Sequence, residues 1–346
     1  MTKKEGNRDI EQLGEFGLIR LLTRNIKLKH ASSEMGVGDD AAVLDMKNRK
    51  TIVTSDILTE GIHFDLIYTP LKHLGYKAVV VNLSDIYAMN AIPSQILVSI
   101  SISSKFTAEM VEEIYAGIHL ACKIYHVDLV GGDTSSSMTG LTISITALGS
   151  APAEKITYRS GAKKDDLICV TGDLGSSFMG LQLLEREKKI FEKSRNMQPD
   201  FSGYDYLLER QLKPEARSDI IQLFSDQQIR PTSMIDISDG LSSEILHICE
   251  ASNTGCKIYL DKIPLAAETK KLSEELNMEA ITASLNGGED YELLFTVPLT
   301  EYEKISSVKG VSVIGHITDK KDGRYLVMPD GSLTGIMALG WNSLSG

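Results

Sequence analysis

Short acidic motifs beside apolar runs are the feature that most constrains how this chain folds. Nearly every motif follows or abuts a run rich in β-branched residues, and Gly, Ser or Thr surrounds it. Carboxylates at strand ends, next to small residues, suit Mg²⁺, which takes a few carboxylates together with phosphate oxygens and water. The pattern therefore predicts an α/β protein that binds magnesium and a nucleotide and transfers a phosphoryl group. The six motifs are Gly38-Asp39-Asp40, Thr54-Ser55-Asp56, Leu83-Ser84-Asp85, Gly131-Gly132-Asp133, Asp236-Ile237-Ser238-Asp239-Gly240 and Gly287-Gly288-Glu289-Asp290.

Composition narrows the class of protein further. The 346 residues suffice for about two domains of roughly 150 residues each. A net charge of −11 argues against nucleic-acid binding, because phosphate backbones attract basic surfaces. No apolar run reaches the roughly 18 residues of a membrane helix, and the N-terminus lacks the apolar core of a signal peptide. The cysteines form no C-x-x-C pair and are predicted to be buried, reduced thiols of a cytoplasmic protein.

Apolar periodicity predicts two α/β domains, covering residues 1–150 and 151–346. The boundary lies where the sequence becomes rich in Pro, Gly and basic residues, over 151–164. In the first domain we expect helices over 15–24, 71–89 and 108–125 and strands over 51–54, 96–101, 127–130 and 141–148. In the second we expect strands over 166–170, 234–236, 257–260, 292–297 and 312–315 and helices over 177–187 and up to Cys249. The charged segment 185–211 is predicted to be an exposed helical excursion.

Several motifs have both a chemical and a structural interpretation. Asp236 and Asp239 are three residues apart across a strand-to-helix turn, so both can face one site. Alternatively, Asp239 and its neighbour Ser238 are good helix N-cap residues. Gly131-Gly132-Asp133 closes a predicted strand, where glycine lets backbone N–H groups contact phosphate. Gly172 to Ser177 gives a weaker signal of the same kind. The sequence contains no Walker A loop, so a kinase of this type would neutralise its triphosphate with several metal ions.

Taken together, the motifs resemble the thiamine-monophosphate kinase family, within the ATP-binding superfamily that includes aminoimidazole ribonucleotide synthetase. The resemblance covers residues ~14–341, with the motifs in the family's order. It is carried by GEFGLI (14–19), GVGDDAAVL (36–44), TSDILTEGIHF (54–64), KAVVVNLSDIYAMNAIP (77–93), LVGGDT (129–134), RSGAKKDD (159–166), IDISDGL (235–241) and GGEDYELLF (287–295).

The resemblance implies transfer of the γ-phosphoryl group of ATP to thiamine monophosphate, which gives thiamine diphosphate. It places several Mg²⁺ ions on Asp40, Thr54, Ser55, Asp56, Asp85, Asp133, Asp236 and Asp239. It places ATP on Gly132, Asp133, Arg159 and Ser238, and thiamine phosphate on His63, Glu289 and Trp341. No general base is expected, because the acceptor phosphate is already ionised at neutral pH. The resemblance also implies a homodimer, in which the N-terminal sheets pair into a shared barrel and a C-terminal α/β domain covers each site.

The residues leave alternatives open. His63 is a lone histidine of a kind that is commonly structural, and Trp341 could plug the core or stack on a ring. Ser176 stands where many relatives carry an aspartate, and the 185–211 segment looks longer than usual. A selenophosphate synthetase would carry a Cys within residues 1–35, and a hydrogenase-maturation relative would end in Cys. Aminoimidazole ribonucleotide synthetase, a non-catalytic nucleotide or metal sensor, and aspartates that serve only as caps and turns are further alternatives.

Overall fold

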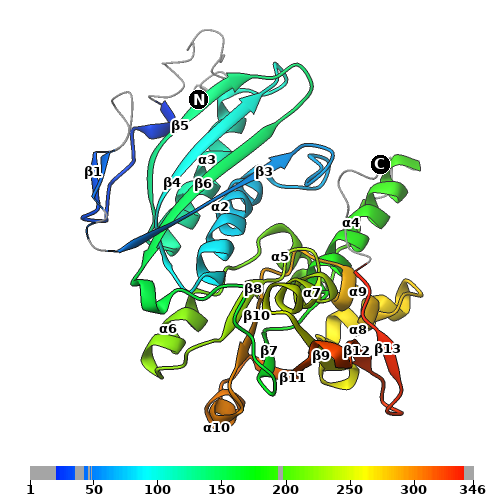
Figure 1. Cartoon of the computed structure of the whole chain (residues 1–346). Coiled ribbons are helices and arrows are strands. Elements are labelled where there is room, and N and C mark those ends of the chain that lie inside the picture. The colour runs from blue at the N-terminus through cyan, green and yellow to red at the C-terminus, as the bar shows by residue number, and fades with distance from the viewer. Residues whose placement is uncertain (1–20, 36–42, 46, 48, 194–197, 339–346) are drawn as a thin grey trace. The chain divides into compact units, whose positions relative to one another are not determined.

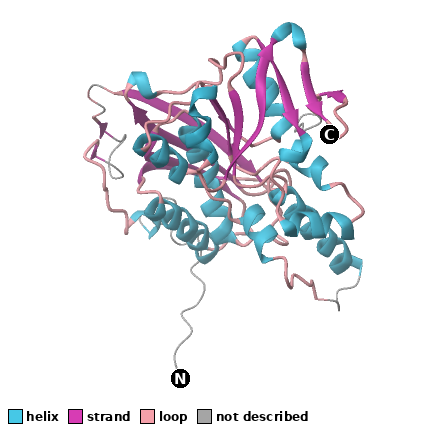
Figure 2. Ribbon diagram, turned by 90° about the horizontal axis from the view of Figure 1, so that it is seen from below, coloured by secondary structure: helices cyan, strands magenta, loops and turns pink. Residues whose placement is uncertain are grey.

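The computed structural model describes residues 21–35, 43–45, 47, 49–193 and 198–338 of the chain. It divides into two compact units. The first runs to Ile86 and resumes from Ala91 to Glu154, and the second comprises 87–90 and the chain from Lys155 onwards. Helices and strands both contribute throughout, which gives the mixed α/β class that the sequence predicts (Figure 2). None of the described helices combines the length and apolar character that crossing a membrane requires.

The first unit is built on a four-stranded sheet (Figure 1). Its strands, in spatial order, are β3 (Lys50–Thr59), β6 (Thr142–Ala151), β4 (Ile92–Ile102) and β5 (Asp128–Ser136). β6 runs antiparallel to both of its neighbours, whereas β4 and β5 are parallel. A short antiparallel pair, β1 (Ser33–Met35) and β2 (Val43–Leu44), lies outside this sheet. The helices are α2 (Leu71–Ala88) and α3 (Ala108–Ile124).

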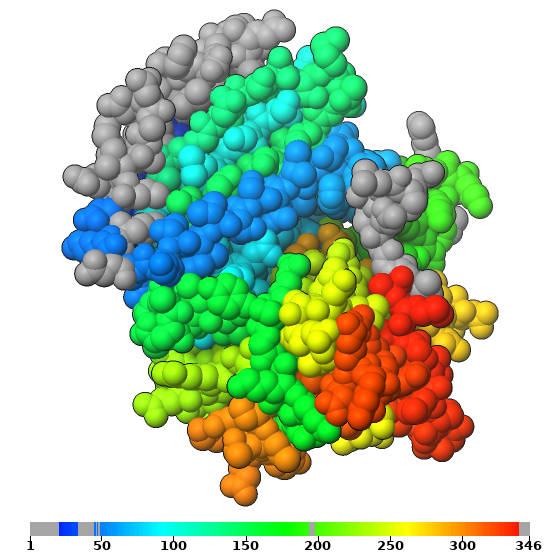
Figure 3. Space-filling model, in the orientation of Figure 1, coloured from blue at the N-terminus to red at the C-terminus, as the bar shows by residue number. Residues whose placement is uncertain are grey.

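One face of this sheet is covered and the other is open. Along β3, Leu58 is buried while Val53 and Ile57 are 59% and 54% exposed, the alternation of a strand with one core-facing side. β6 alternates in the same way. Helices α2 and α3 lie against the covered face (Figure 1), and strands of the open face are visible at the surface of the unit (Figure 3). The open face therefore displays apolar side chains that the described chain does not bury.

Two glycines let α2 and α3 pack backbone to backbone. A Cβ atom on Gly117 would lie 1.8 Å from the carbonyl oxygen of Lys72. A Cβ atom on Gly75 would lie 1.9 Å from the carbonyl oxygen of Ile114. Any side chain at either position forces the helices apart, since real atoms do not approach so closely.

The substitution Gly117→Ala should therefore destabilise the protein although alanine favours a helix by about 1 kcal/mol over glycine. We expect a net loss of about 2 kcal/mol in the free energy of unfolding, because overpacking costs more than propensity gains. Urea denaturation followed by circular dichroism measures it. Gly335→Ala is the matched control, because nothing lies within 4 Å of a Cβ atom there. Equal stability of the two variants would contradict the helix contact.

The second unit contains a seven-stranded sheet. Its spatial order is β13 (Leu333–Gly335), β12 (Arg324–Val327), β9 (Thr254–Tyr259), β11 (Val311–Asp319), β7 (Leu167–Thr171), β10 (Leu293–Val297) and β8 (Ser233–Asp236). Neighbours are antiparallel except for β9 and β12. The helices are α4 (Ser176–Lys193), α5 (Asp205–Leu212), α6 (Ser218–Asp226), α7 (Leu241–Ser252), α8 (Ala267–Glu275), α9 (Ala280–Asn286) and α10 (Tyr302–Ser306).

Helices cover both faces of this sheet near β10. Leu294 belongs to the buried cluster that includes Ile245 of α7. The next residue, Phe295, points to the opposite face, where its ring packs edge-on against Phe224 of α6 with centroids 5.0 Å apart. A separate apolar cluster joins α4, α5 and α8. The strand ends around β7, β8 and β10 are therefore held by packed side chains on both faces of the sheet.

The structure confirms the two long helices of the first unit and corrects the positions of two acidic motifs. The strands that we expect over 51–54 and 127–130 end at these motifs. Instead Ser55-Asp56 lies within β3 and Gly131-Gly132-Asp133 within β5, whereas Ser84-Asp85 lies within α2, inside the helix expected over 71–89. β3 continues because its ladder with β6 extends over ten residues. Of the helix expected over 15–24, residues 21–23 are helical and those before 21 lie outside the described residues.

Candidate functional site

In the first unit, β3 and α2 bring three predicted metal-binding side chains together. The Oγ1 hydroxyl of Thr54 donates to Oδ2 of Asp85 at 2.5 Å. The backbone N–H of Asp56 donates to Oδ1 of Asn82 at 3.0 Å. Asn82 and Asp85 are three apart on α2, so they share a helix face, and alternate residues of β3 point to them. Asn82 was not predicted as a site residue, although its spacing from Asp85 in the NLSD motif was a usable signal.

The electrostatics of this group favour a cation. Burial, and then the neighbouring Asp85 carboxylate, raise the pKa of Asp56 to about 6. A bound divalent cation would reverse this effect and favour the ionised carboxylates. The donors are all oxygens, the ligands that Mg²⁺ takes. Among the described residues, no three His, Cys, Asp or Glu side chains gather closely enough to hold a metal ion, so phosphate oxygens and water would complete the coordination.

Two other predicted ligands of this unit lie elsewhere. Ser55 points to the open face, where its Oγ is 3.0 Å from Oγ1 of Thr146. Asp133 is on β5, at the opposite edge of the sheet from β3. Three strand spacings separate the two edges, about 14 Å. The fold of a single chain therefore does not bring Asp133 to Asp56.

Gly132 has a structural reason to be glycine. A Cβ atom there would lie 1.8 Å from the carbonyl oxygen of Val98 on the paired strand β4. Its φ of +155° is also one that side chains rarely adopt. The sheet therefore requires this glycine whether or not it contacts a nucleotide.

His63 closes the turn after β3. Its Nδ1 accepts the backbone N–H of Thr59 at 3.1 Å, which holds the half-buried ring at the end of the strand that carries Asp56. Accepting at Nδ1 leaves the proton of the neutral ring on Nε2. The remaining predicted residues of the N-terminal and C-terminal segments, Asp40 and Trp341, lie outside the described residues.

In the second unit, two loops pair at the edge where β8 ends and β10 begins. The N–H of Glu289 donates to the carbonyl oxygen of Ser238 at 2.7 Å, and that of Tyr291 donates to Ile237 at 2.9 Å. The pairing depends on Gly288, whose φ is +71° and whose Cβ would lie 2.4 Å from the Ser238 oxygen. The loops thereby place Glu289 beside Ser238 and next to the turn that follows Asp236.

The turn before α7 is held by a buried carboxylate and not by an N-cap side chain. We considered Ser238 and Asp239 as caps, but the N-cap residue is Gly240, which has no side chain. Instead Oε1 of Glu244 accepts the N–H of Asp239 at 2.9 Å. Burial raises the pKa of Glu244 to about 8. Ser238 and Asp239 remain exposed, so their side chains are available to a ligand.

The glycine loop before α4 already holds an anion of the protein itself. Oδ2 of Asp290 accepts the N–H of Gly175 at 2.8 Å, and Oδ1 accepts that of Ser177 at 3.4 Å. Asp290 is 1% exposed. The start of α4, which we interpreted as a weak phosphate-binding signal, therefore binds the carboxylate of the GGEDYE loop in this structure.

Two arginines form ion pairs with Glu292 of the same loop. Its Oε1 accepts a hydrogen bond from Nη1 of Arg210 at 2.9 Å, and its Oε2 accepts one from Nη1 of Arg217 at 2.6 Å. The Glu292 side chain is 3% exposed and that of Arg210 is 13% exposed. The prediction that segment 185–211 is a solvated excursion is thus wrong at its end, where α5 packs against the loop. The sequence does not reveal these ion pairs, because a charged side chain is ordinarily expected to be exposed to solvent.

Arg159 lies away from the paired loops. The Oγ of Ser252, the last residue of α7, donates to the carbonyl oxygen of Arg159 at 3.4 Å. Ser238 precedes the start of α7, and a helix of 12 residues spans about 18 Å. Within the second unit, Arg159 and Ser238 are therefore at opposite ends of the same helix.

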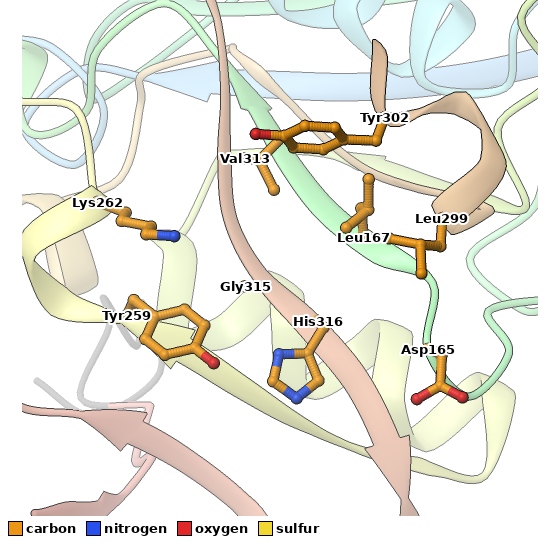
Figure 4. A pocket seen from close by; sticks show the side chains of 9 residues that line it. All are labelled: Asp165, Leu167, Tyr259, Lys262, Leu299, Tyr302, Val313, Gly315 and His316. Carbon is orange, nitrogen blue, oxygen red and sulfur yellow. The ribbon is translucent and has the colours of Figure 1, made fainter. Parts of the chain in front are cut away.

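A separate hollow of about 530 Å³ lies on the seven-stranded sheet of the second unit (Figure 4). Two tyrosines, Tyr259 and Tyr302, flank β11 there, and Lys262 and His316 lie next to Tyr259. Leu167, at the start of β7, forms part of its wall, whereas the glycine loop follows the other end of that strand. The hollow contains none of the predicted site residues, so it is distinct from the paired loops.

Replacing one arginine of the Glu292 group should destabilise the protein strongly. We expect Arg210→Met to cost about 3 kcal/mol in the free energy of unfolding, because it removes one of the two arginines that pair with the buried Glu292 and also the cation next to the buried Asp290. Lys271→Met is the control, since its pair with Glu275 spans 3.9 Å and its side chain is 64% exposed. Urea denaturation compares the two. Similar losses in both variants would show that the Arg210 ion pairs contribute no more than a surface pair.

Removing one carboxylate of the Asp56–Asp85 pair should stabilise the metal-free protein. At pH 7.5, above the raised pKa of Asp56, both carboxylates are ionised in the folded state and repel each other. In EDTA we expect Asp85→Asn to gain about 1 kcal/mol, or roughly 3 °C in thermal midpoint.

Added Mg²⁺ should raise the midpoint of the wild type more than that of Asp85→Asn, which lacks one carboxylate of this pair. The control is Asp226→Asn, an exposed aspartate on α6, which should behave as the wild type. A midpoint of Asp85→Asn that equals or falls below the wild-type value in EDTA would contradict the repulsion.

Comparison with known proteins places this geometry in a family. The AIR synthase related protein N-terminal domain matches residues 38–151, and the AIR synthase related protein C-terminal domain matches residues 163–327. The thiamine-monophosphate kinase of Bacillus subtilis (strain 168) is 35% identical over 324 residues, which cover 92% of this chain and 95% of that protein. The thiamine-monophosphate kinase of Aquifex aeolicus (strain VF5) is 34% identical over 325 residues, 91% of this chain and 99% of that protein.

A solved structure shows the same arrangement of elements. The structure of AaThiL complexed with AMPPCP and TMP superposes with a TM-score of 0.73 and 32% sequence identity, over 96% of this chain and 97% of that one. Identity above 30% across nearly the whole of both chains confirms the resemblance in the motifs. The chain belongs to the thiamine-monophosphate kinase family.

Proposed function

We propose that this protein transfers the γ-phosphoryl group of ATP to the phosphate of thiamine monophosphate, giving thiamine diphosphate and ADP. The observation that carries this proposal is the 35% identity with the Bacillus subtilis thiamine-monophosphate kinase over 92% of this chain. In the reaction, the bond from the γ-phosphorus to the β–γ bridging oxygen breaks, and an oxygen of thiamine monophosphate forms the new bond.

Magnesium ions would be held by carboxylates of both units. In the first unit they are Asp56 and Asp85 with Thr54, whose oxygen donors fit Mg²⁺. In the second they are Asp236 and Asp239, and the resemblance adds Asp40, Ser55 and Asp133. When bound, Mg²⁺ neutralises and aligns the phosphates. The raised pKa of Asp56 supports this role, because a bound cation offsets both the burial and the Asp85 repulsion that raise it.

The chain's own residues then bind and orient, without a general base. A phosphate monoester has a second pKa of about 6, so the acceptor oxygen is ionised at neutral pH. We assign ATP to Gly132, Asp133, Arg159 and Ser238. We assign thiamine phosphate to His63, Glu289 and Trp341, where a carboxylate and an aromatic face suit the positively charged thiazolium ring of thiamine.

We also propose a homodimer in the cytoplasm. The exposed Val53 and Ile57 on the open face of the first sheet support pairing with a second copy, because such apolar positions mark interaction surfaces. All four cysteines are free and buried, which suits a reducing compartment. We further propose that residues 1–150 form an ATP- and Mg²⁺-binding domain and that residues 151–346 form a C-terminal domain.

A product assay with two acceptors, and a tube without acceptor, tests the function. We expect thiamine diphosphate only in the tube that contains ATP, Mg²⁺ and thiamine monophosphate, and none with free thiamine, without acceptor or with EDTA. Chromatography resolves the three thiamine species. Asp56→Asn protein, purified in parallel, controls for contaminating kinases and should be inactive. If ATP binds in a Mg²⁺-dependent way but no thiamine diphosphate forms, the substrate assignment is wrong.

A further inference from the structure

We propose that Gln211, on α5, is a positioning residue that holds the carboxylate of Glu289 for thiamine phosphate. The inference rests on the proposed function, in which Glu289 contacts that substrate. Gln211 itself does not touch the reacting atoms in this account. It acts through Glu289.

The hydrogen bonds around Gln211 fix its amide in one orientation. The Ser177 hydroxyl donates to Oε1 of Gln211 at 2.6 Å, and Nε2 of Gln211 donates to Oε2 of Glu289 at 2.9 Å. A carboxylate can only accept, so the amide must turn its NH₂ group to Glu289, and the hydroxyl fits the remaining oxygen. Gln211 is 5% exposed, so water does not readily replace these bonds.

Glu289 needs such support because its loop is strained. Its own φ is +57° and that of Tyr291 is +53°, values that cost non-glycine residues about 1 kcal/mol or more. The backbone bond to Ser238 fixes the main chain, but the glutamate side chain still has three rotatable bonds. The amide of Gln211 restricts those rotations. A neutral donor also leaves the negative charge of Glu289 to act on a cationic ring.

Helix α5 is itself anchored to the same loops, so Gln211 cannot simply follow a moving Glu289. The neighbouring Arg210 pairs with Glu292 and donates through Nη2 to the carbonyl oxygens of Asp173 at 3.1 Å and Asp290 at 3.3 Å. These bonds tie α5 to Asp290 and Glu292, which follow Glu289 in the chain, and to Asp173 in the glycine loop before α4. The helix therefore serves as a fixed support from which the amide reaches the carboxylate.

A double-mutant cycle tests the proposal with Gln211→Met, which keeps the volume of the side chain but removes the amide. We expect the KM for thiamine monophosphate to rise about five- to tenfold, because one hydrogen bond to a charged group is lost. The KM for ATP should change little. In the Glu289→Ala background, Gln211→Met should have no further effect, because the group that it positions is gone.

Two further variants keep the test sharp. Gln222→Met on α6 is the matched control, since its exposed amide donates to Oδ1 of Asp226 at 2.8 Å; it should leave all constants unchanged. If Gln211→Met does not fold, Ser177→Ala removes the hydroxyl that orients the amide. We expect it to raise the KM for thiamine monophosphate about threefold.

The proposal is overturned if Gln211→Met raises both KM values together, or if its effect multiplies with that of Glu289→Ala. It also falls if Glu289→Ala leaves the KM for thiamine monophosphate unchanged. Wild-type protein that still makes thiamine diphosphate would then show that the proposed function stands while this inference fails. Absence of thiamine diphosphate from the wild type would instead overturn the proposed function.

Discussion

The charge of buried carboxylates is the constraint on which both units depend, and each unit meets it differently. In the second unit, Glu292 lies between Arg210 and Arg217, so the chain supplies its own cations. In the first unit, burial and Asp85 both disfavour ionisation of Asp56 and raise its pKa to about 6. Removing a charge from water is costly unless a counter-charge compensates it. Carboxylates paired internally thus support the fold, whereas the pair on β3 and α2 is suited to a cation from outside.

Internally paired carboxylates also hold the strained backbone of the GGEDYE loop. The GGEDYE loop holds Glu289 and Tyr291 at positive φ, and it persists because hydrogen bonds from three directions fix it. Asp290 binds the start of α4, Glu292 binds the arginines, and the backbone pairs with the loop after β8. Strain of this kind is retained at functional sites when the surroundings determine it. The glycine loop before α4 therefore supports the GGEDYE loop, because the N–H groups of Gly175 and Ser177 donate to Asp290.

Local pattern predicted the long helices and the mixed α/β class, because α2 and α3 follow a continuous helical spacing. The motifs identified the family, which the comparisons confirm. The placement of acidic motifs within elements could not be predicted, since the length of β3 is set by its pairing with β6, about 90 residues away. For the same reason the spacing of Asp56 and Asp133 gave no sign that they lie on opposite edges of one sheet. The burial of Arg210 could not be predicted either, because its partner Glu292 is 82 residues distant in the sequence.

We propose that the carboxylates of β3 and α2 bind a divalent cation of the reaction. Anomalous diffraction from crystals grown with Mn²⁺ and a non-hydrolysable ATP analogue would locate that cation, since Mn²⁺ takes the same oxygen ligands as Mg²⁺. We expect an anomalous peak coordinated by oxygens of Asp56 and Asp85. A bound nucleotide with Mn²⁺ located elsewhere, and none at this pair, would contradict it.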